Sequence, residues 1–280
     1  MKILRVNQEY ENLLLTLKAD CSKCNGLCCM ALYFSKIDGF PEDKPPGQPC
    51  KNLLPDFRCR VHSALAEKGL TGCRAYDCFG AGQHVVQYLY QGKSWAELPE
   101  QAGEMTEVFF LLWRLYQMRW YLCEAGMICS GLSLKQQVDG LILENKNKAG
   151  QPPAELLTMD LTPHKKRVDQ ALKEAAKAVS ANFSTKPLGG GDLIGKSFRG
   201  KNLDGQDFSM ALLLAADLEG CSLYGANFLG ADLRDANLKN TDLRQSLFLT
   251  QGQVNAACGN KNTKLPLWLD VPSAWKGGQG

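Results

Sequence analysis

Cysteine is concentrated in one short stretch of this chain of 280 residues. A thiolate can bind a soft metal ion, or it can act as a nucleophile when its pKa is lowered. The N-terminal segment has no sustained apolar run and no small-residue cleavage site, so we expect a cytoplasmic protein. In a reducing compartment, clustered cysteines more often bind metal or carry redox chemistry than form disulfides. Eight of the twelve cysteines make up the cluster: Cys21, Cys24, Cys28, Cys29, Cys50, Cys59, Cys73 and Cys78.

Two pairs in this stretch have the spacing of metal chelators. Cys21 and Cys24 are separated by two residues, and such a turn lets two thiolates meet one tetrahedral ion. Cys59 and His62 share this spacing, although His62 is the weaker candidate ligand.

The remaining cysteines are less regular. Cys73 and Cys78 have a looser spacing that still permits joint ligation. Side chains of neighbouring residues are expected to diverge, so at Cys28 and Cys29 we expect one to bind metal while the other packs, bridges or serves a second site. The cluster predicts either Zn²⁺ or an iron–sulfur cluster held by four thiolates, and spacing alone does not choose between them.

The cysteine segment resembles the YkgJ-type family of zinc- or iron-chelating domains. That family shares a C-x2-C pair, a following CC pair and later paired cysteines. Here Cys21, Cys24, Cys28 and Cys29 match the first block, and Cys50, Cys59, Cys73 and Cys78 match the later one. The family commonly carries Arg-Pro before its late cysteine, whereas Gly72 precedes Cys73 in this chain.

The elements that would position these cysteines are few. The segment 41–49 is rich in Pro and Gly and is predicted to be a loop, so the cluster needs another source of order, which a metal supplies. Residues 94–148 are predicted to be helical, and apolar residues cover nearly all sides from Met105 to Met127, which favours a central buried helix. A further amphipathic helix is predicted to begin at Thr162 and end near Ser180.

A large apolar residue then recurs at every fifth position. An α-helix repeats near 3.6 residues and a strand at 2, so neither places this column on one face. Small residues stand two positions earlier, short polar residues lie between the two columns, and Gly often ends the repeat. The column consists of Leu193, Phe198, Leu203, Phe208, Leu213, Leu218, Leu223, Phe228, Leu233, Leu238, Leu243 and Phe248.

This pattern resembles the pentapeptide-repeat family, whose fold is a right-handed, four-sided β-helix. The resemblance implies about three coils, with four repeats in each. Lys196, Lys201 and Gln206 depart from the family pattern, because they occupy the small-residue column of the early repeats. We therefore expect an α+β multidomain chain that ends in a right-handed quadrilateral β-helix.

The predicted organisation has four parts. Residues 1–90 form a cysteine-rich metal-binding module, and residues 91–185 form a helical region that packs on it and caps the solenoid. Residues 186–265 form the β-helix, and residues 266–280 form a C-terminal cap or tail. Trp268 and Trp275 in that tail are expected to cover the last coil or to form a homodimer contact.

Net charge and hydropathy exclude several kinds of partner. A net charge of +3 is nearly neutral at this length, so direct nucleic-acid binding and membrane binding are not expected. The most apolar run, Val108 to Trp113, is too short to span a bilayer and is followed by Arg114. No catalytic constellation is recognised, and the cysteine spacing typical of clusters that open S-adenosylmethionine is absent, so the sequence favours a protein that is not an enzyme.

Three functions follow from these features. The first is a metal-stabilised, cytoplasmic, bacterial interaction protein whose β-helix presents a surface to a protein partner. The second is an iron–sulfur redox sensor or enzyme. The third is protection of DNA gyrase by DNA mimicry, which the resemblance to the pentapeptide family suggests. A rod of about 14 Å with six basic and eight acidic outward residues is a poor duplex mimic, so the third is disfavoured.

Overall fold

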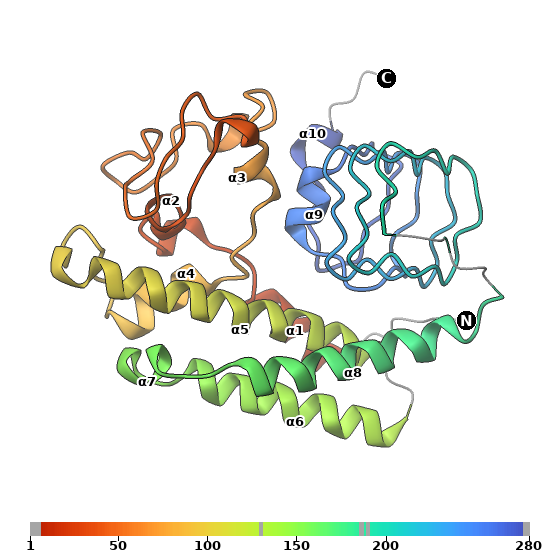
Figure 1. Cartoon of the computed structure of the whole chain (residues 1–280), viewed down its shortest axis with the longest axis horizontal. Coiled ribbons are helices and arrows are strands. Elements are labelled where there is room, and N and C mark those ends of the chain that lie inside the picture. Colours follow the sequence, from red (N-terminus) through yellow and green to blue (C-terminus); the bar gives the residue numbers. More distant parts are fainter. Residues whose placement is uncertain (1–6, 129–130, 185–187, 189–190, 277–280) are drawn as a thin grey trace.

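The computed structural model describes residues 7–128, 131–184, 188 and 191–276. Figure 1 shows a helical layer that carries two lobes side by side, the cysteine-rich lobe and the coils of the repeat region. The long helix α5, Ala102–Ile128, runs beneath both lobes.

The cysteine-rich lobe consists mainly of loops and short helical turns. Its own apolar core is small, since Phe34, Phe40 and Leu70 form a buried cluster separate from the main core. A lobe with so little buried apolar surface needs additional cross-links for stability. Its short elements, with those that join it to the helical layer, are η1 (Cys21–Lys23), α2 (Leu27–Ala31), η2 (Lys36–Asp38), η3 (His62–Ala64), α3 (Thr71–Ala75), α4 (Ala81–His84), the π-helical turn η4 (Val85–Leu89) and η5 (Pro99–Gln101).

The helical layer is organised around α5, as its apolar sequence predicts. Met105, Leu112 and Leu122 are fully buried, and α5 packs against helices on several sides. The polar side chains Arg119 and Asn145 are also buried, and they bond to each other, with Arg119 Nε 2.9 Å from Asn145 Oδ1. The surrounding helices are α1 (Gln8–Thr16), α6 (Leu132–Ala149), α7 (Pro153–Leu157) and α8 (Thr162–Ser180).

The repeat region forms stacked coils in which the apolar column points inward. Phe208, Phe228 and Phe248 are at most 1% exposed, and the rings of Phe208 and Phe228 stack with their centroids 5.3 Å apart. Parallel bridges join residues twenty positions apart, such as Asp192 to Leu212 and Leu212 to Asp232. Four repeats of five residues therefore make one coil.

The coils contain fewer regular strands than the predicted fold class implies. Within the described residues the ladders consist of isolated bridges, and no continuous β-strand is present. The physical reason is that each flat side is only a few residues long before the chain turns at a left-handed corner. Gly195 and Gly200, with φ of 63° and 68°, are two such corners.

The C-terminal end of the coils is closed by two short helices, α9 (Gln251–Ala256) and α10 (Ser273–Lys276). Trp268 and Trp275 are 6% and 3% exposed, so both pack within the chain. Leu267 is 82% exposed. Among the described helices, none has both the length and the apolar character needed to cross a membrane.

Candidate functional site

Seven of the eight clustered cysteines converge on one cavity. Its volume is about 750 Å³, and both the cysteine-rich lobe and the C-terminal end of the coils contribute to its wall. The predicted ligands that line it are Cys21, Cys24, Cys28, Cys29, Cys59, His62, Cys73 and Cys78.

The first four thiols are positioned by two adjoining turns. The Asp20 side chain caps η1 by accepting from Ser22 N at 3.1 Å, and Cys24 ends that turn. The helix α2, which carries Cys28 and Cys29, begins after Gly26. Gly26 has φ of 61°, and a Cβ there would lie 2.6 Å from Leu53 Cδ1, so glycine is favoured where the chain turns from one pair to the next.

The later ligands come from a loop and from α3. Cys59 forms an antiparallel bridge with Leu53, and the backbone N of His62 donates to Cys59 O at 3.3 Å. Cys73 lies on α3. Cys78 follows Asp77, whose carboxylate accepts from Phe79 N at 2.8 Å.

Hydrogen bonds among these groups separate the protonation states of neighbouring thiols. Bonds from Cys24 and His62 lower the pKa of Cys21 to about 5. The bond to Cys21, together with burial, raises the pKa of Cys24, and the bond to Cys21 raises the pKa of His62. These shifts favour a thiolate at Cys21, a neutral thiol at Cys24 and the protonated form of His62.

The second pair behaves in the same way, and burial favours the neutral thiol at three further cysteines of the cavity wall. The bond with Cys29 and burial raise the pKa of Cys28, and the bond from Cys28 lowers the pKa of Cys29. Burial raises the pKa of Cys73 and of Cys78 to about 12, and it also raises the pKa of Cys59.

The structure therefore brings the predicted ligands to one cavity, but it does not arrange them around a single metal position. Among the described residues, no three His, Cys, Asp or Glu side chains are placed so as to hold one metal ion. The cysteines that the structure describes are free thiols. The metal, its ligand set and the resemblance to the YkgJ-type family stay predictions.

Not every cysteine of the chain lies at the cavity. Cys50 is outside its wall and packs on the small apolar core of the lobe, although its backbone N bonds to Cys29 O at 3.0 Å. Cys123 is fully buried in the main core, and Cys129 is outside the described residues. His84 is also elsewhere, where its Nδ1 bonds to the hydroxyl of Tyr116.

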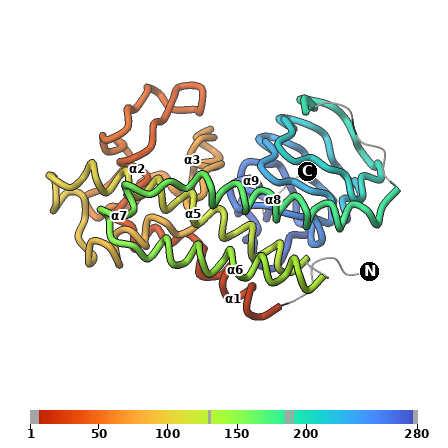
Figure 2. The backbone as a smooth tube through the Cα atoms, turned by 60° about the horizontal axis from the view of Figure 1, so that its bottom comes forward, coloured from red at the N-terminus to blue at the C-terminus, as the bar shows by residue number. Residues whose placement is uncertain are grey.

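The opposite wall was not foreseen from the sequence. Gln251, Asn255 and Trp275, from α9 and α10, face the thiols across the cavity. Figures 1 and 2 both place α9 next to α3. Arg74 and Tyr76 also line the cavity, and their position between Cys73 and Cys78 is the sequence feature that could have indicated this.

Arg74 joins the two walls. Its Nη2 lies 2.9 Å from Asp235 Oδ1 and 3.0 Å from Ala256 O, so it binds the repeat region through both a charge and a carbonyl. The close approach of the backbones is allowed by Gly252, where a Cβ would stand 2.3 Å from Ala75 O.

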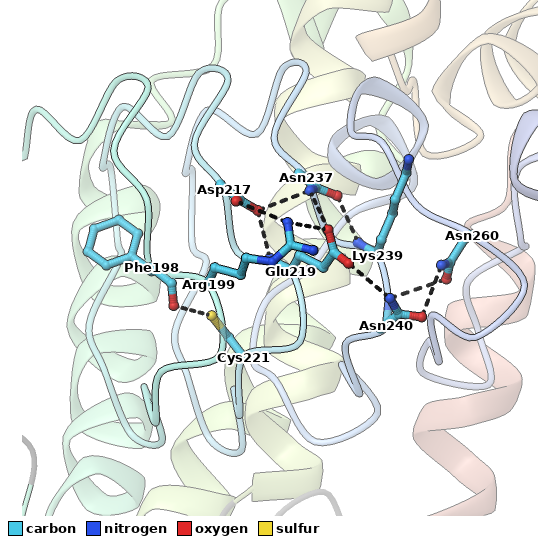
Figure 3. A network of polar contacts seen from close by, with 9 residues as sticks. All are labelled: Phe198, Arg199, Asp217, Glu219, Cys221, Asn237, Lys239, Asn240 and Asn260. Atoms are coloured by element: carbon cyan, nitrogen blue, oxygen red, sulfur yellow. Dashed lines mark hydrogen bonds and ion pairs between the residues drawn. The ribbon is translucent and has the colours of Figure 1, made fainter. Parts of the chain in front are cut away.

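One outward side of the coils carries a network of polar side chains (Figure 3). Arg199 Nη1 lies 2.9 Å from Glu219 Oε2, which also accepts from Asn237 Nδ2 at 3.1 Å. Asn240 Nδ2 donates to Glu219 Oε1 at 3.2 Å, and Asn260 Nδ2 donates to Asn240 Oδ1 at 3.0 Å. Charges on this side are thus paired with neighbours from adjacent coils and do not form a continuous acidic stripe.

The buried apolar column, which repeats every five residues, and the bridges between residues twenty positions apart define a pentapeptide-repeat protein. The family model "Pentapeptide repeats" matches residues 211–248 in eight copies. The chain belongs to the same family as the uncharacterized protein YybG of Bacillus subtilis (strain 168). The two are 42% identical over 272 residues, which cover 95% of this chain and 98% of that protein.

Two solved pentapeptide-repeat structures are similar over part of the chain. Rfr23 from the cyanobacterium Cyanothece 51142 is 30% identical, with a TM-score of 0.23, over 25% of this chain and 46% of that one. A pentapeptide repeat protein from the thylakoid lumen of Arabidopsis thaliana is 28% identical, with a TM-score of 0.17. That match covers 30% of this chain and 67% of the other.

Proposed function

We propose that the chain is a metal-stabilised interaction protein whose cysteine-rich lobe binds Zn²⁺ through thiolates and whose coils present a surface to a protein partner. The observation that carries the metal half of this proposal is the convergence of seven thiols and His62 on one cavity. Such a concentration of soft donors is unusual outside metal and redox sites.

The donor set suits zinc in kind and in number. A structural zinc takes four N or S ligands, so these eight donors suffice for one or two ions. Cys21 and Cys29 have lowered pKa values and offer the first thiolates. A bound divalent cation would favour deprotonation of the remaining thiols and would cross-link a lobe that has only a small apolar core.

An iron–sulfur centre is the second candidate, and the surplus of thiols favours it. A cluster needs four thiolates, and seven line the cavity. In that case, the lobe would act as a redox sensor or as the cofactor site of an enzyme.

The interaction half of the proposal rests on the outward sides of the coils. Short polar side chains bonded across coils, such as Asn237 to Asp217 at 3.0 Å, give a rigid surface of fixed shape. Ile194, Met210 and Leu212 add exposed apolar area on the first two coils, with 48%, 74% and 45% of each residue exposed. A surface of this mixed kind suits a protein partner better than a nucleic acid.

The test is elemental analysis, with a visible spectrum, of anaerobically purified full-length protein. About one or two zinc ions per chain in colourless protein would support the structural zinc site. Iron with acid-labile sulfide and absorption at about 400 nm would support the iron–sulfur centre instead. Neither metal in folded protein would overturn the metal proposal.

A pair of variants makes the metal test specific to the cavity. Cys24→Ser with Cys78→Ser removes two thiols from the cavity wall and should lower the metal content. Cys258→Ser removes an exposed thiol outside that wall and should leave the metal content unchanged. Equal losses in both proteins would show that the metal is not bound at the cavity.

The partner is tested separately, by affinity capture with the full chain as bait. The matched bait replaces Met210 and Leu212 with Ser. A protein that is retained by the wild-type chain and lost by this variant would support the interaction role. A protein retained equally by both would place the contact elsewhere on the molecule.

A further inference from the structure

Two residues of the cavity wall each carry a buried polar atom without a hydrogen-bond partner. These atoms are the hydroxyl oxygen of Tyr76 and Nε of Arg74, and neither atom is paired within the described part of the chain. Both residues line the same cavity as the thiols. A phenol has an ordinary pKa of about 10 and a guanidinium is always charged, so at neutral pH each group offers a hydrogen to an acceptor.

Both donors are fixed in place by their surroundings. The other end of the Arg74 guanidinium is held by Asp235 and by Ala256 O, so Nε is not free to turn towards solvent. The Tyr76 ring lies 5.5 Å from the ring of Trp113, and the indole N–H of Trp113 is itself anchored on Asp77 O at 2.8 Å. Donors held in this way can bind a ligand with little loss of conformational entropy.

A buried donor without an acceptor destabilises a protein, because its hydrogen bond to water is lost and not replaced. Such a cost is commonly tolerated where a ligand supplies the missing acceptor. The acidic groups of the cavity wall are already engaged, since Asp20 accepts from Ser22 and Asp77 accepts from Phe79 N. In the described part of the chain neither carboxylate accepts from Arg74 Nε or the Tyr76 hydroxyl, so both donors still lack an acceptor.

The size and position of the cavity suit a small molecule. Its volume of about 750 Å³ exceeds the space needed by one metal ion and falls within the range of ligand pockets. It lies between two parts of the molecule, a common location for such sites. The far wall adds the polar side chains Gln251, Asn255 and Ser273 beside the ring of Trp275.

We propose that this cavity binds a small molecule through an oxyanion group, a carboxylate or a phosphate, that accepts hydrogen bonds from Arg74 Nε and the Tyr76 hydroxyl. The rest of the ligand lies between the thiol wall and the wall formed by α9 and α10. The inference shares its cavity with the proposed metal but does not require the metal as a ligand of the oxyanion.

Tyr76→Phe is the informative variant, because it removes only an oxygen that has no partner among the described residues. Without ligand, this variant should melt at the same temperature as the wild type or higher. Tyr88→Phe is the matched control, since Tyr88 is 77% exposed and is not part of the cavity wall.

The experiment is calorimetric titration of inorganic phosphate and, separately, of succinate into full-length protein as purified. Wild type and Tyr88→Phe should bind one of these probes with equal affinity, and Tyr76→Phe should bind it about tenfold or more weakly. Binding of phosphate alone assigns the phosphate class, and binding of succinate alone assigns the carboxylate class.

Two results would overturn the inference: no binding of either probe to the wild type, or equal binding by Tyr76→Phe. Metal content is measured on the same samples. Binding by protein that carries no metal would refute the metal proposal and leave this inference standing. Metal-loaded protein that binds neither probe would do the reverse.

Discussion

At the scale of single residues, the corner of each repeat decides whether the chain can turn. Ten consecutive corners have a left-handed backbone, and glycine occupies six of them. An L-residue in this conformation brings its Cβ close to the following carbonyl oxygen, which costs about 1–2 kcal/mol. The four corners without glycine are Met210, Ala215, Asp235 and Asn240.

Replacing Ala215 by Gly should therefore stabilise the coils. Ala215 has φ of 54° and is exposed, so the change removes backbone strain without loss of buried surface. The expected gain is about 0.5–1 kcal/mol, because the greater freedom of glycine in the unfolded chain offsets part of the relief. Scanning calorimetry of the repeat transition measures it.

Gly195→Ala is the reciprocal control. Gly195 has φ of 63°, and a Cβ there would meet no atom within 4 Å, so only backbone strain is introduced. It should lower stability by about as much as Ala215→Gly raises it. If both variants shift the unfolding transition in the same direction, backbone strain at the corners does not determine the stability of the coils.

Glu124 is a second position where a single residue controls stability. It lies on α5, is 1% exposed, and accepts from Phe248 N at 2.6 Å, so it joins the helical layer to the last coil. Burial raises the pKa of Glu124 to about 8. A glutamate in the unfolded chain has a pKa of about 4.3, so the folded chain binds this proton more tightly. The free energy of unfolding therefore falls as pH rises between these two pKa values.

Glu124→Gln should remove that pH dependence, because the amide keeps an acceptor for Phe248 N and never ionises. The melting temperature of the wild type should fall more than that of the variant from about pH 5 to about pH 9, with the largest difference at the alkaline end. Parallel curves for the two proteins would mean that Glu124 does not change its protonation state on unfolding in this range.

At the scale of elements, the contact between α3 and α9 joins the two lobes. The α3 segment carries Cys73 and Arg74, and it touches α9 where a glycine allows the backbones to meet. Any change in the thiol cluster that moves α3 is therefore transmitted to the helix that closes the coils.

A methyl group at the contact should separate the two elements. In Gly252→Ala, the new Cβ would stand 2.3 Å from Ala75 O, which is backbone and cannot turn away. We expect a loss of about 1–3 kcal/mol in thermal unfolding. The same variant should expose the Arg74 side of α3 to limited proteolysis by trypsin.

Gly140→Ala provides the matched control for a glycine in a helix. Gly140 lies within α6, where a Cβ would meet no atom within 4 Å. Higher helix propensity should then stabilise the protein by about 1 kcal/mol. A similar loss in both variants would show that the effect at Gly252 does not arise from the contact with α3.

At the scale of the whole molecule, a metal in the cysteine-rich lobe would affect the distant end of the coils. If the thiols hold Zn²⁺, a chelator should loosen the lobe, release the bond from Arg74 to Asp235 and speed hydrogen exchange in α9. The middle coil, around Leu218, is fully buried and should exchange at an unchanged rate. Equal protection of α9 before and after metal removal would refute the coupling.

Sequence alone determined the parts of this protein that depend on short-range order. The column from Leu193 to Phe248 predicted the coils, because each coil contacts the next only twenty residues away and repeats the same local choice. The apolar run of α5 predicted a buried helix in the same way. The cysteine spacings predicted which side chains gather in the N-terminal lobe, and seven of the eight cysteines lie at the cavity wall.

The tertiary structure decided how these parts meet. Arg74 and Asp235 are 161 residues apart in the chain, and no local pattern indicates that the cysteine-rich lobe packs on the closing end of the coils. The cavity has its wall of Gln251 and Asn255 only because of that packing. A binding site between two lobes is fixed by the packing of their surfaces, which no periodicity within either lobe encodes.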